Sequence, residues 1–329
     1  MTADRPSEDD LIARYFAPIA GAGGLGLRDD AARIAPPPGC EIVLTVDGLV
    51  AGVHFFADDP PAAIARKALR VNLSDLAAKG AAPLGFLLTL ALPRDWKSDW
   101  LALFAKGLGD DAAAFGCPLL GGDTVSTPGP LTLSITALGA VPAGRMVPRD
   151  GARAGDALYV SGTIGDAALG LLVRSEPEGS RSMEVADRAF LLDRYLLPQP
   201  RAALTEALRE HASAAMDVSD GLVGDLSKML RVSGASAEVD AAHVPLSQAA
   251  RNMIVGQSRL LERALTGGDD YEILASVPPG RVDAFEAAAR AAGVPVTRIG
   301  TVTAGQGAPT FRDARGAPMS FERGSYSHF

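Results

Sequence analysis

Aspartate residues recur beside glycine, serine and threonine at the ends of apolar segments in both halves of the chain. Gly121-Gly122-Asp123-Thr124 lies between two apolar runs, and Asp217-Val218-Ser219-Asp220-Gly221 follows a short apolar run. Adjacent glycines let the backbone turn and approach a ligand closely, because no Cβ is present to clash. A carboxylate beside such a backbone can hold a hard cation against a phosphate. The two segments are therefore candidates for a phosphate site, with a plain turn as the alternative for Gly-Gly-Asp alone. The second segment opens a helix expected over 222–232, whose N-terminal amides favour an anion, and a simple helix cap is the alternative for Asp220.

More oxygen-bearing side chains stand on elements expected in the first half. A strand is expected over residues 41–47, with a second extended segment over 48–55. The strand carries Thr45 and Asp47 two positions apart, so both side chains project from one face. A helix expected over residues 60–80 carries Asp75 within the run 71–78, whose other residues are uncharged. These positions predict an oxygen-lined edge at which a metal ion can bind.

The acidic residues can converge only if cations offset their mutual repulsion. Oxygen ligands without a cysteine or histidine cluster select Mg²⁺ rather than zinc, and Mg²⁺ is usually held by a few carboxylates together with substrate phosphates. The pattern therefore indicates nucleoside triphosphate chemistry. For the pair Asp29-Asp30, simple solvation is the alternative. The candidate carboxylates are Asp30, Asp47, Asp75, Asp123, Asp217 and Asp220.

Other nucleotide-binding motifs are excluded. The stretch Gly21-Ala22-Gly23-Gly24-Leu25-Gly26 matches G-x-G-x-x-G, but a helix is expected before it, whereas the dinucleotide fingerprint needs a strand before and a helix after. We expect a flexible glycine-rich loop there. The chain has no G-x-x-x-x-G-K-[ST] segment and no H-R-D or D-F-G set, which excludes a P-loop enzyme and a protein kinase. The residues thus predict an ATP-using, Mg²⁺-dependent enzyme and leave its acceptor unnamed.

Composition narrows the class of partner. The chain has 329 residues, 47% of them hydrophobic, with a net charge of −8 and a pI of about 5.1. This balance argues against nucleic acid and anionic membrane as partners. Two cysteines fit a reducing compartment, and no signal peptide or apolar run of membrane-spanning length is visible. We expect a soluble, cytoplasmic protein.

Hydrophobic periodicity predicts an α+β or α/β first half followed by a second domain. Prolines and glycines, together with Arg145, Arg149 and Arg153, interrupt the pattern near residues 142–156, so the expected domains are 1–145 and 146–329. One of these arginines can contact phosphate, with a solvated linker as the alternative. Ser7 is expected to cap a helix over 8–20, with Asp10 completing a capping box, and Ser98 to cap a helix over 98–115. Further helices are expected over 184–196, 200–210, 222–232 and 281–292. Further strands are expected over 84–92, 130–141, 157–161, 273–277 and 294–303.

Several motifs, in order along nearly the whole chain, resemble those of the thiamine-monophosphate kinase family. This family is part of a superfamily with aminoimidazole ribonucleotide synthetase and selenophosphate synthetase. The motifs are Asp29-Asp30-Ala31-Ala32, the run from Leu44 to Phe55, the run from Lys67 to Ala78, Gly121-Gly122-Asp123-Thr124, the run from Met216 to Leu222, the run from Gly267 to Glu272, and His328-Phe329.

The resemblance implies a two-domain, aminoimidazole ribonucleotide synthetase-like α+β fold. Residues 1–145 would form an N-terminal α+β domain that binds ATP and Mg²⁺ and dimerises, and residues 146–329 a C-terminal α/β domain that completes the active site. It implies a homodimer that transfers the ATP γ-phosphoryl to thiamine monophosphate with the help of several Mg²⁺ ions, without a covalent intermediate. A related cyclase and a non-catalytic nucleotide-binding scaffold are the alternatives.

The resemblance also implies roles for single residues. Asp47, Asp123 and Asp217 would position the reacting groups. ATP would meet Gly122, Asp123, Arg149 and Ser219. Thiamine monophosphate would meet His54, Asp269 and Phe321. Mg²⁺ would be held by Asp30, Thr45, the backbone of Val46, Asp47, Asp75, Asp123, Asp217 and Asp220.

Three positions depart from the family pattern. Arg28 replaces a glycine before the Asp-Asp pair, and Asp269 stands where the family usually has Glu, one methylene longer. Phe321 lies near the place of an aromatic, often Trp, that stacks on the substrate, and a phenyl ring can also stack. None of the three is a metal ligand in the implied set.

Overall fold

The computed structural model describes residues 7–178, 180, 183–255 and 257–326. The chain divides into two compact units, the first formed by Met1–Leu76 and Ala81–Gly144 and the second by Ala77–Gly80 and Arg145–Phe329. The motif His328-Phe329 lies outside the described residues. In the described part of the chain, no helix is both long and apolar enough to cross a membrane.

The first unit begins with short helical segments rather than the single helix expected over 8–20. α1 (Glu8–Leu11) continues into a π-helical turn, η1 (Ile12–Phe16), and a 3₁₀ turn, η2 (Ala17–Ile19). The Ser7 hydroxyl accepts a hydrogen bond from the Asp10 amide at 3.1 Å and donates one to its carboxylate at 2.7 Å, so the predicted cap is confirmed.

The glycine-rich stretch that follows is not the open loop expected from the sequence. It forms short 3₁₀ turns over η3 (Ala22–Leu27), interrupted where Leu25 and Gly26 adopt a left-handed backbone. The Gly21 amide donates to the Leu119 carbonyl at 2.8 Å. A Cβ placed on Gly24 would lie 2.7 Å from the Leu120 carbonyl oxygen. Glycine is needed at this position because backbone approaches backbone.

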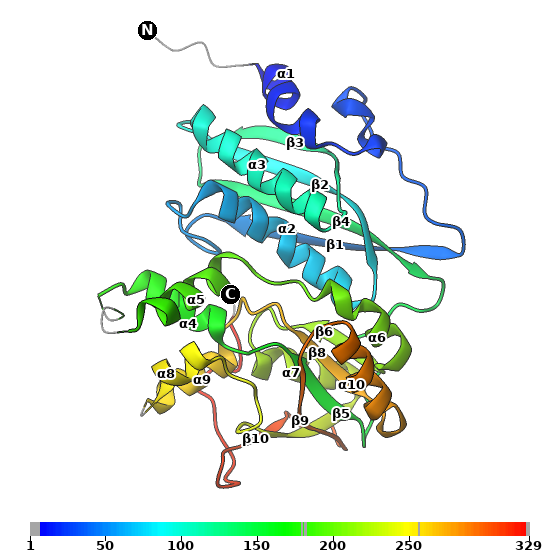
Figure 1. Cartoon of the computed structure of the whole chain (residues 1–329), viewed down its shortest axis with the longest axis vertical. Helices are drawn as coiled ribbons and strands as arrows, with labels where there is room; N and C mark the ends of the chain where they lie inside the picture. Colours follow the sequence, from blue (N-terminus) through cyan, green and yellow to red (C-terminus); the bar gives the residue numbers. More distant parts are fainter. Residues whose placement is uncertain (1–6, 179, 181–182, 256, 327–329) are drawn as a thin grey trace. The chain divides into compact units, whose positions relative to one another are not determined.

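A four-stranded sheet forms the body of the first unit. Its order is β1-β4-β2-β3, with β2 and β3 parallel and the other pairs antiparallel. Two helices cover one of its faces (Figure 1). The strands are β1 (Cys40–Val50), β2 (Ala82–Pro93), β3 (Leu119–Thr127) and β4 (Thr132–Pro142), and the helices are α2 (Pro61–Ala78) and α3 (Ser98–Ala114).

Three local expectations in this unit are wrong. The segment Gly121–Thr124 lies inside β3 and is not a turn. Residues 41–50 belong to one strand, and a hydrogen-bonded turn replaces the second extended segment expected at its end. Ser98 is the first residue of α3, and the capping position is Lys97, which makes no side-chain cap. Gly121 and Gly122 therefore belong to a strand rather than to a turn, and Ser98 begins the helix rather than capping it.

The second unit is built on a six-stranded sheet of order β10-β7-β9-β5-β8-β6. Its pairs are antiparallel except for β10 with β7. The strands are β5 (Ala157–Ser161), β6 (Ala214–Asp217), β7 (Ala235–Asp240), β8 (Ile273–Val277), β9 (Val296–Ala304) and β10 (Thr310–Arg312).

Helices pack around this sheet. The short elements β7, β10, α8 and α9 were not expected from the sequence. A core under α7 includes Leu226, Met229 and Leu274, all fully buried. The helical segments are α4 (Asp166–Ser175), α5 (Val185–Leu196), η4 (Ala202–Leu204), α6 (Thr205–His211), α7 (Leu222–Ser233), α8 (Gln248–Ile254), α9 (Ser258–Thr266), η5 (Pro279–Arg281) and α10 (Val282–Ala291).

Candidate active site

Strand β1 and helix α2 bring together part of the predicted metal-binding set. The Thr45 hydroxyl donates a hydrogen bond to Asp75 Oδ2, across 30 residues of sequence. Thr45 and Asp47 pair with Ala137 and Ile135 of β4, both fully buried, so their side chains project toward the face covered by helices. Thr45, Asp47 and Asp75 therefore form one oxygen-rich group in the first unit.

The structure does not add Asp123 to this group within the unit. Asp123 pairs with the exposed residue Thr89 of β2, so it projects from the opposite face of the sheet. Strands β1 and β3 are the two edges of the sheet, three strand spacings or roughly 14 Å apart. Val46 is 61% exposed on that opposite face, and Asp30 is exposed in the loop after η3.

Gly122 is constrained by the neighbouring strand. A Cβ on Gly122 would lie 1.8 Å from the carbonyl oxygen of Leu88, its register partner on β2. No side chain fits there without displacing the strand. The requirement for glycine is thus explained by sheet packing, whatever the ligand.

His54 lies in the turn after β1 with its ring fixed by the backbone. Its Nδ1 accepts a hydrogen bond from the Val50 amide at 3.0 Å, and its carbonyl accepts one from Lys67 Nζ at 3.2 Å. An imidazole that accepts at Nδ1 carries its proton on Nε2. His54 can therefore donate a hydrogen bond from Nε2 to a ligand oxygen.

In the second unit, the turn between β6 and α7 collects the other predicted carboxylates. Asp217 ends β6 and is 5% exposed. The amides of Ser219 and Asp220 donate to Asp225 Oδ2 at 2.9 and 2.8 Å, and Asp225 is fully buried. Lys228 bridges Asp220 and Asp225, at 2.8 Å from the latter.

Asp225 is a residue that the sequence analysis missed, and it changes the expected use of this helix N-terminus. The capping position of α7 is Gly221, so the alternative of Asp220 as a simple cap is wrong. The amides of Ser219 and Asp220, at the position where an anion was expected, donate instead to the carboxylate of Asp225. Burial alone would lower the pKa of Lys228, but its bonds to Asp220 and Asp225 outweigh this and raise the pKa. Lys228 is therefore a cation at neutral pH.

The segment Gly267–Glu272 has an uncommon backbone. Asp269 and Tyr271 have φ values of +75° and +51°, which place both in the left-handed region. Such conformations cost roughly 1–2 kcal/mol per non-glycine residue and are found at functional sites. The Asp269 amide donates to the Ser219 carbonyl at 2.9 Å, which ties the predicted substrate residue to the β6–α7 turn.

Two other predicted residues occupy different surroundings. Arg149 is exposed in the segment before β5. The Phe321 ring packs edge-on against Phe311, with the ring centroids 5.4 Å apart, and is partly buried against the core. Its ring is thus already held by protein contacts.

The donors in these groups are carboxylate and hydroxyl oxygens, which suit Mg²⁺. Among the described residues, no three or more His, Cys, Asp or Glu side chains gather as a metal cage. Mg²⁺ is usually bound through one or two carboxylates, with water and phosphate completing the shell. Asp75, which is hydrogen-bonded to Thr45, and Asp47, which lies on the same face of β1 as Thr45, can take this role.

Comparisons with known proteins match this chain along nearly its whole length. The family model "AIR synthase related protein, N-terminal domain" matches residues 28–141, and "AIR synthase related protein, C-terminal domain" matches 153–310. The thiamine-monophosphate kinase of Caulobacter vibrioides is 45% identical over 315 residues, covering 94% of this chain and 88% of that protein. The chain belongs to the thiamine-monophosphate kinase family.

Solved structures of this family share the fold. The crystal structure of thiamine-monophosphate kinase from Stenotrophomonas maltophilia has a TM-score of 0.80 and 39% identity, covering 89% of this chain and 91% of that chain. AaThiL complexed with AMPPCP and TMP has a TM-score of 0.77 and 31% identity, covering 92% and 91%. The expected two-domain α+β fold is therefore confirmed.

The stability of the second unit should depend on the protonation of Asp270. Burial raises the pKa of this carboxyl well above its ordinary value, although the amides of Gly165 and Ala167 donate to it at 2.6 and 3.2 Å. The folded state then binds the proton more tightly than the unfolded state. The free energy of unfolding should therefore fall as pH rises from about 4, the ordinary carboxyl pKa, through the raised value.

Urea unfolding measured across this pH range checks the prediction. Wild type should lose stability relative to Asp270→Asn as pH rises, whereas the exposed-residue control Asp95→Asn should follow wild type. Parallel curves for wild type and Asp270→Asn would contradict it.

Proposed function

We propose that this protein is a thiamine-monophosphate kinase, which transfers the γ-phosphoryl group of ATP to the phosphate of thiamine monophosphate and releases thiamine diphosphate and ADP. The observation that carries the proposal is 45% identity to a thiamine-monophosphate kinase over 94% of the chain. A relative of the same fold in complex with AMPPCP and TMP supports both substrates.

In this proposal, each unit supplies its own part of the active-site residues. The first unit supplies metal ligands from Asp30, Thr45, the backbone of Val46, Asp47, Asp75 and Asp123, with Gly122 near ATP and His54 near the acceptor. The second supplies Asp217 and Asp220 as metal ligands, Arg149 and Ser219 for ATP, and Asp269 and Phe321 for the acceptor. The contact between Thr45 and Asp75 supports the first group, and the tie between Asp269 and Ser219 supports the second.

The residues act by positioning rather than by covalent chemistry. An acceptor phosphate is already ionised near neutral pH, so no strong general base is needed for in-line transfer. Bound Mg²⁺ would offset the negative charge on the phosphates of ATP and of the acceptor. His54 can donate from Nε2 to a phosphate oxygen, because Val50 fixes its tautomer. Asp269 can face the cationic thiazolium ring of thiamine.

The direct test is product analysis. Purified protein is incubated with ATP, thiamine monophosphate and Mg²⁺, and thiamine diphosphate, ADP and inorganic phosphate are separated by chromatography. Thiamine diphosphate and ADP should appear in equal amounts and only with Mg²⁺. ADP with inorganic phosphate would indicate a cyclase-like reaction, and absence of turnover by folded, ATP-binding protein would refute the kinase.

The sheet of the first unit supports the proposal of a homodimer. The face opposite α2 and α3 exposes apolar side chains from three strands, including Leu44 at 63%, Val46 at 61% and Val125 at 43%. Apolar side chains gathered on one sheet face are typical of a protein interface. A second copy of the chain, presenting the same face, would bury them.

Replacing Leu44 by Arg should therefore dissociate the dimer, because it places a charge in the buried face. The matched control is Leu103→Arg on α3, where the native side chain is similarly exposed at 52% but lies on a helix of the other face. Light scattering should give a dimer mass for wild type and Leu103→Arg and a monomer mass for Leu44→Arg. A monomeric wild type, or a dimeric Leu44→Arg, would contradict the assignment.

A further inference from the structure

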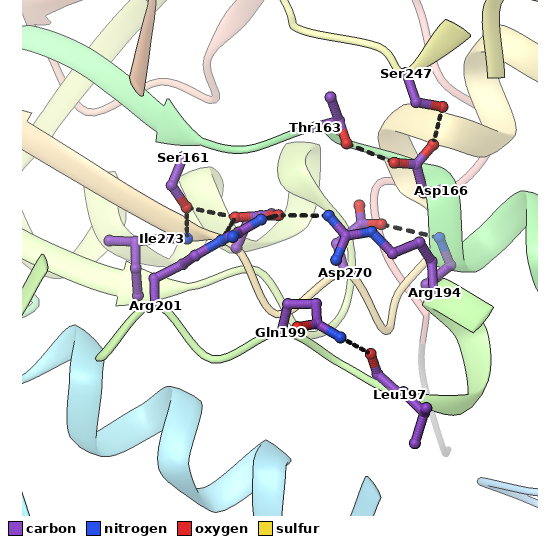
Figure 2. A network of polar contacts seen from close by, with 12 residues as sticks. Ser161, Thr163, Asp166, Arg194, Leu197, Gln199, Arg201, Ser247, Asp270 and Ile273 are labelled. Carbon is purple, nitrogen blue, oxygen red and sulfur yellow. Dashed lines mark hydrogen bonds and ion pairs between the residues drawn. The ribbon is translucent and has the colours of Figure 1, made fainter. Parts of the chain in front are cut away.

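A buried ion pair lies directly next to the strained segment that carries Asp269. Glu272 ends this segment and its side chain is 3% exposed. Arg201, which precedes η4, binds the Glu272 carboxylate through both Nε and Nη2, the former at 2.6 Å from Oε2. Arg194 of α5 lies 3.7 Å from Oε1. A bidentate guanidinium–carboxylate contact fixes orientation as well as distance. Figure 2 labels Arg194, Arg201 and Ser161 and draws their contacts as dashed lines.

Ser161 joins the ion pair to the backbone at the C-terminal end of the segment. Its hydroxyl donates to Glu272 Oε2 at 2.6 Å and accepts from the Ile273 amide at 2.8 Å. The carbonyl of Glu272 accepts from the Val218 amide at 2.8 Å, next to the β6–α7 turn. We call Glu272, Arg201 and Ser161 the Glu272 clamp. It holds the C-terminal end of the strained segment.

A glycine makes room for this clamp. A Cβ on Gly162 would lie 2.1 Å from Glu272 Oε1 and 2.4 Å from Arg201 Nη2. Gly162 also has a φ of +53°, in the left-handed region that glycine adopts readily. Glycine at position 162 therefore allows both the left-handed backbone and the close approach of the Arg201 guanidinium and the Glu272 carboxylate.

The N-terminal end of the segment is held by close backbone contacts instead. A Cβ on Gly268 would lie 2.4 Å from the Ser219 carbonyl oxygen, and that carbonyl accepts the Asp269 amide. Asp269 therefore sits between a backbone anchor and the clamp. The middle of the segment is held as well, since the Tyr271 amide donates to the Val218 carbonyl at 2.8 Å and the Asp270 carboxylate accepts from the Gly165 amide at 2.6 Å. These contacts together stabilise the left-handed backbone of Asp269 and Tyr271.

We infer that the Glu272 clamp is a positioning element for acceptor recognition: it keeps Asp269 in the conformation that faces thiamine monophosphate. The inference rests on the proposed function, in which Asp269 contacts the acceptor. In this inference, Glu272, Arg201 and Ser161 act on the acceptor through Asp269. Loosening the clamp should weaken binding of the acceptor and leave ATP binding unchanged.

The experiment compares wild type, Glu272→Gln, Asp269→Asn and the double variant. Calorimetry with thiamine monophosphate alone, and with a non-hydrolysable ATP analogue alone, measures the two affinities, and steady-state assays give KM for each substrate. Glu272→Gln should raise Kd and KM for thiamine monophosphate about tenfold, with the ATP-analogue Kd within about twofold and kcat nearly unchanged, as expected for lost ground-state binding.

The double variant separates positioning from general structural damage. If Glu272 acts through Asp269, the double variant should bind the acceptor no more weakly than Asp269→Asn, because the two losses are not additive. Additive losses, or an equal loss of affinity for the ATP analogue, would overturn the inference.

Two further variants keep the test decisive. Arg70→Gln removes another buried bidentate pair, between Arg70 and Asp111 in the first unit, and should lower stability without changing the acceptor Kd. If Glu272→Gln does not fold, Ser161→Ala, which removes two hydrogen bonds, should raise the acceptor Kd about threefold.

Unchanged acceptor affinity in every folded clamp variant overturns the inference and leaves the proposed kinase function intact. Failure of wild type to bind thiamine monophosphate overturns the proposed function itself.

Discussion

Replacing Asp75 by Asn should lower kcat/KM of the kinase reaction by about a thousandfold, which corresponds to about 4 kcal/mol of lost transition-state stabilisation. The substitution keeps the size of the side chain, and an amide oxygen can still accept the hydrogen bond from Thr45. It removes one of the charges that would hold Mg²⁺. The loss is therefore electrostatic, with little effect on the packing of α2.

Initial rates measured over a range of Mg²⁺ concentrations check this prediction. Asp75→Asn should need much more Mg²⁺ for half-maximal rate, and Asp47→Asn should behave alike, because both carboxylates belong to one group. Together the two losses should be less than additive. Asp95→Asn removes an exposed carboxylate from the turn between β2 and α3 and should match wild type. A full rate for Asp75→Asn at low Mg²⁺ would remove Asp75 from the metal site.

Replacing Gly122 by Ala should destabilise the first unit by about 3 kcal/mol or more, at the upper end of the cost of overpacking. The added methyl group would lie 1.8 Å from the Leu88 carbonyl oxygen, so β2 and β3 would have to separate. The effect should appear in the absence of any substrate. Gly122→Ala therefore distinguishes a packing requirement from a requirement of ATP binding.

The matched control is Gly48→Ala on β1, where a Cβ meets no atom within 4 Å. Its free energy of unfolding should change by less than about 1 kcal/mol. Denaturant unfolding of both variants, followed by circular dichroism, gives the comparison. Equal stability of Gly122→Ala and wild type would show that β3 can shift away from β2 at low cost.

Regular patterns and end signals in the sequence predicted most elements of the first unit. The expected helix ending at Gly80 is α2, whose periodic apolar residues Leu69, Leu73 and Leu76 are buried, and Gly80 has a φ of +71° as a C-terminal glycine should. The Ser7 cap is also present. Each of these features depends on residues that are close together in the chain, so a short stretch of sequence is enough to predict it.

Glycine-rich segments were interpreted less well. Gly121 and Gly122 looked like a turn because glycine is common in turns, but they lie in an edge strand whose backbone is packed against β2. The reason for glycine there is an atom of Leu88, more than thirty positions away in the chain. A window around Gly122 does not contain that atom.

Parts of the candidate site could be predicted only as residue types. The aspartates at the ends of apolar runs were found, and Thr45 and Asp75 do meet. Asp225 was missed because an acidic residue in the first turn of a helix is common and signals no partner. Glu272 and Arg201 are 71 residues apart, and neither periodicity nor capping signals point from one to the other.

The narrow space at Gly162 means that positions 162, 201 and 272 should change together in evolution. Because a Cβ at residue 162 would collide with the Glu272–Arg201 pair, a side chain there is compatible only with a smaller or rearranged pair. In an alignment of relatives, a substitution at 162 should coincide with changes at 201 or 272. A relative that keeps Arg and Glu at those two positions should keep glycine at the first.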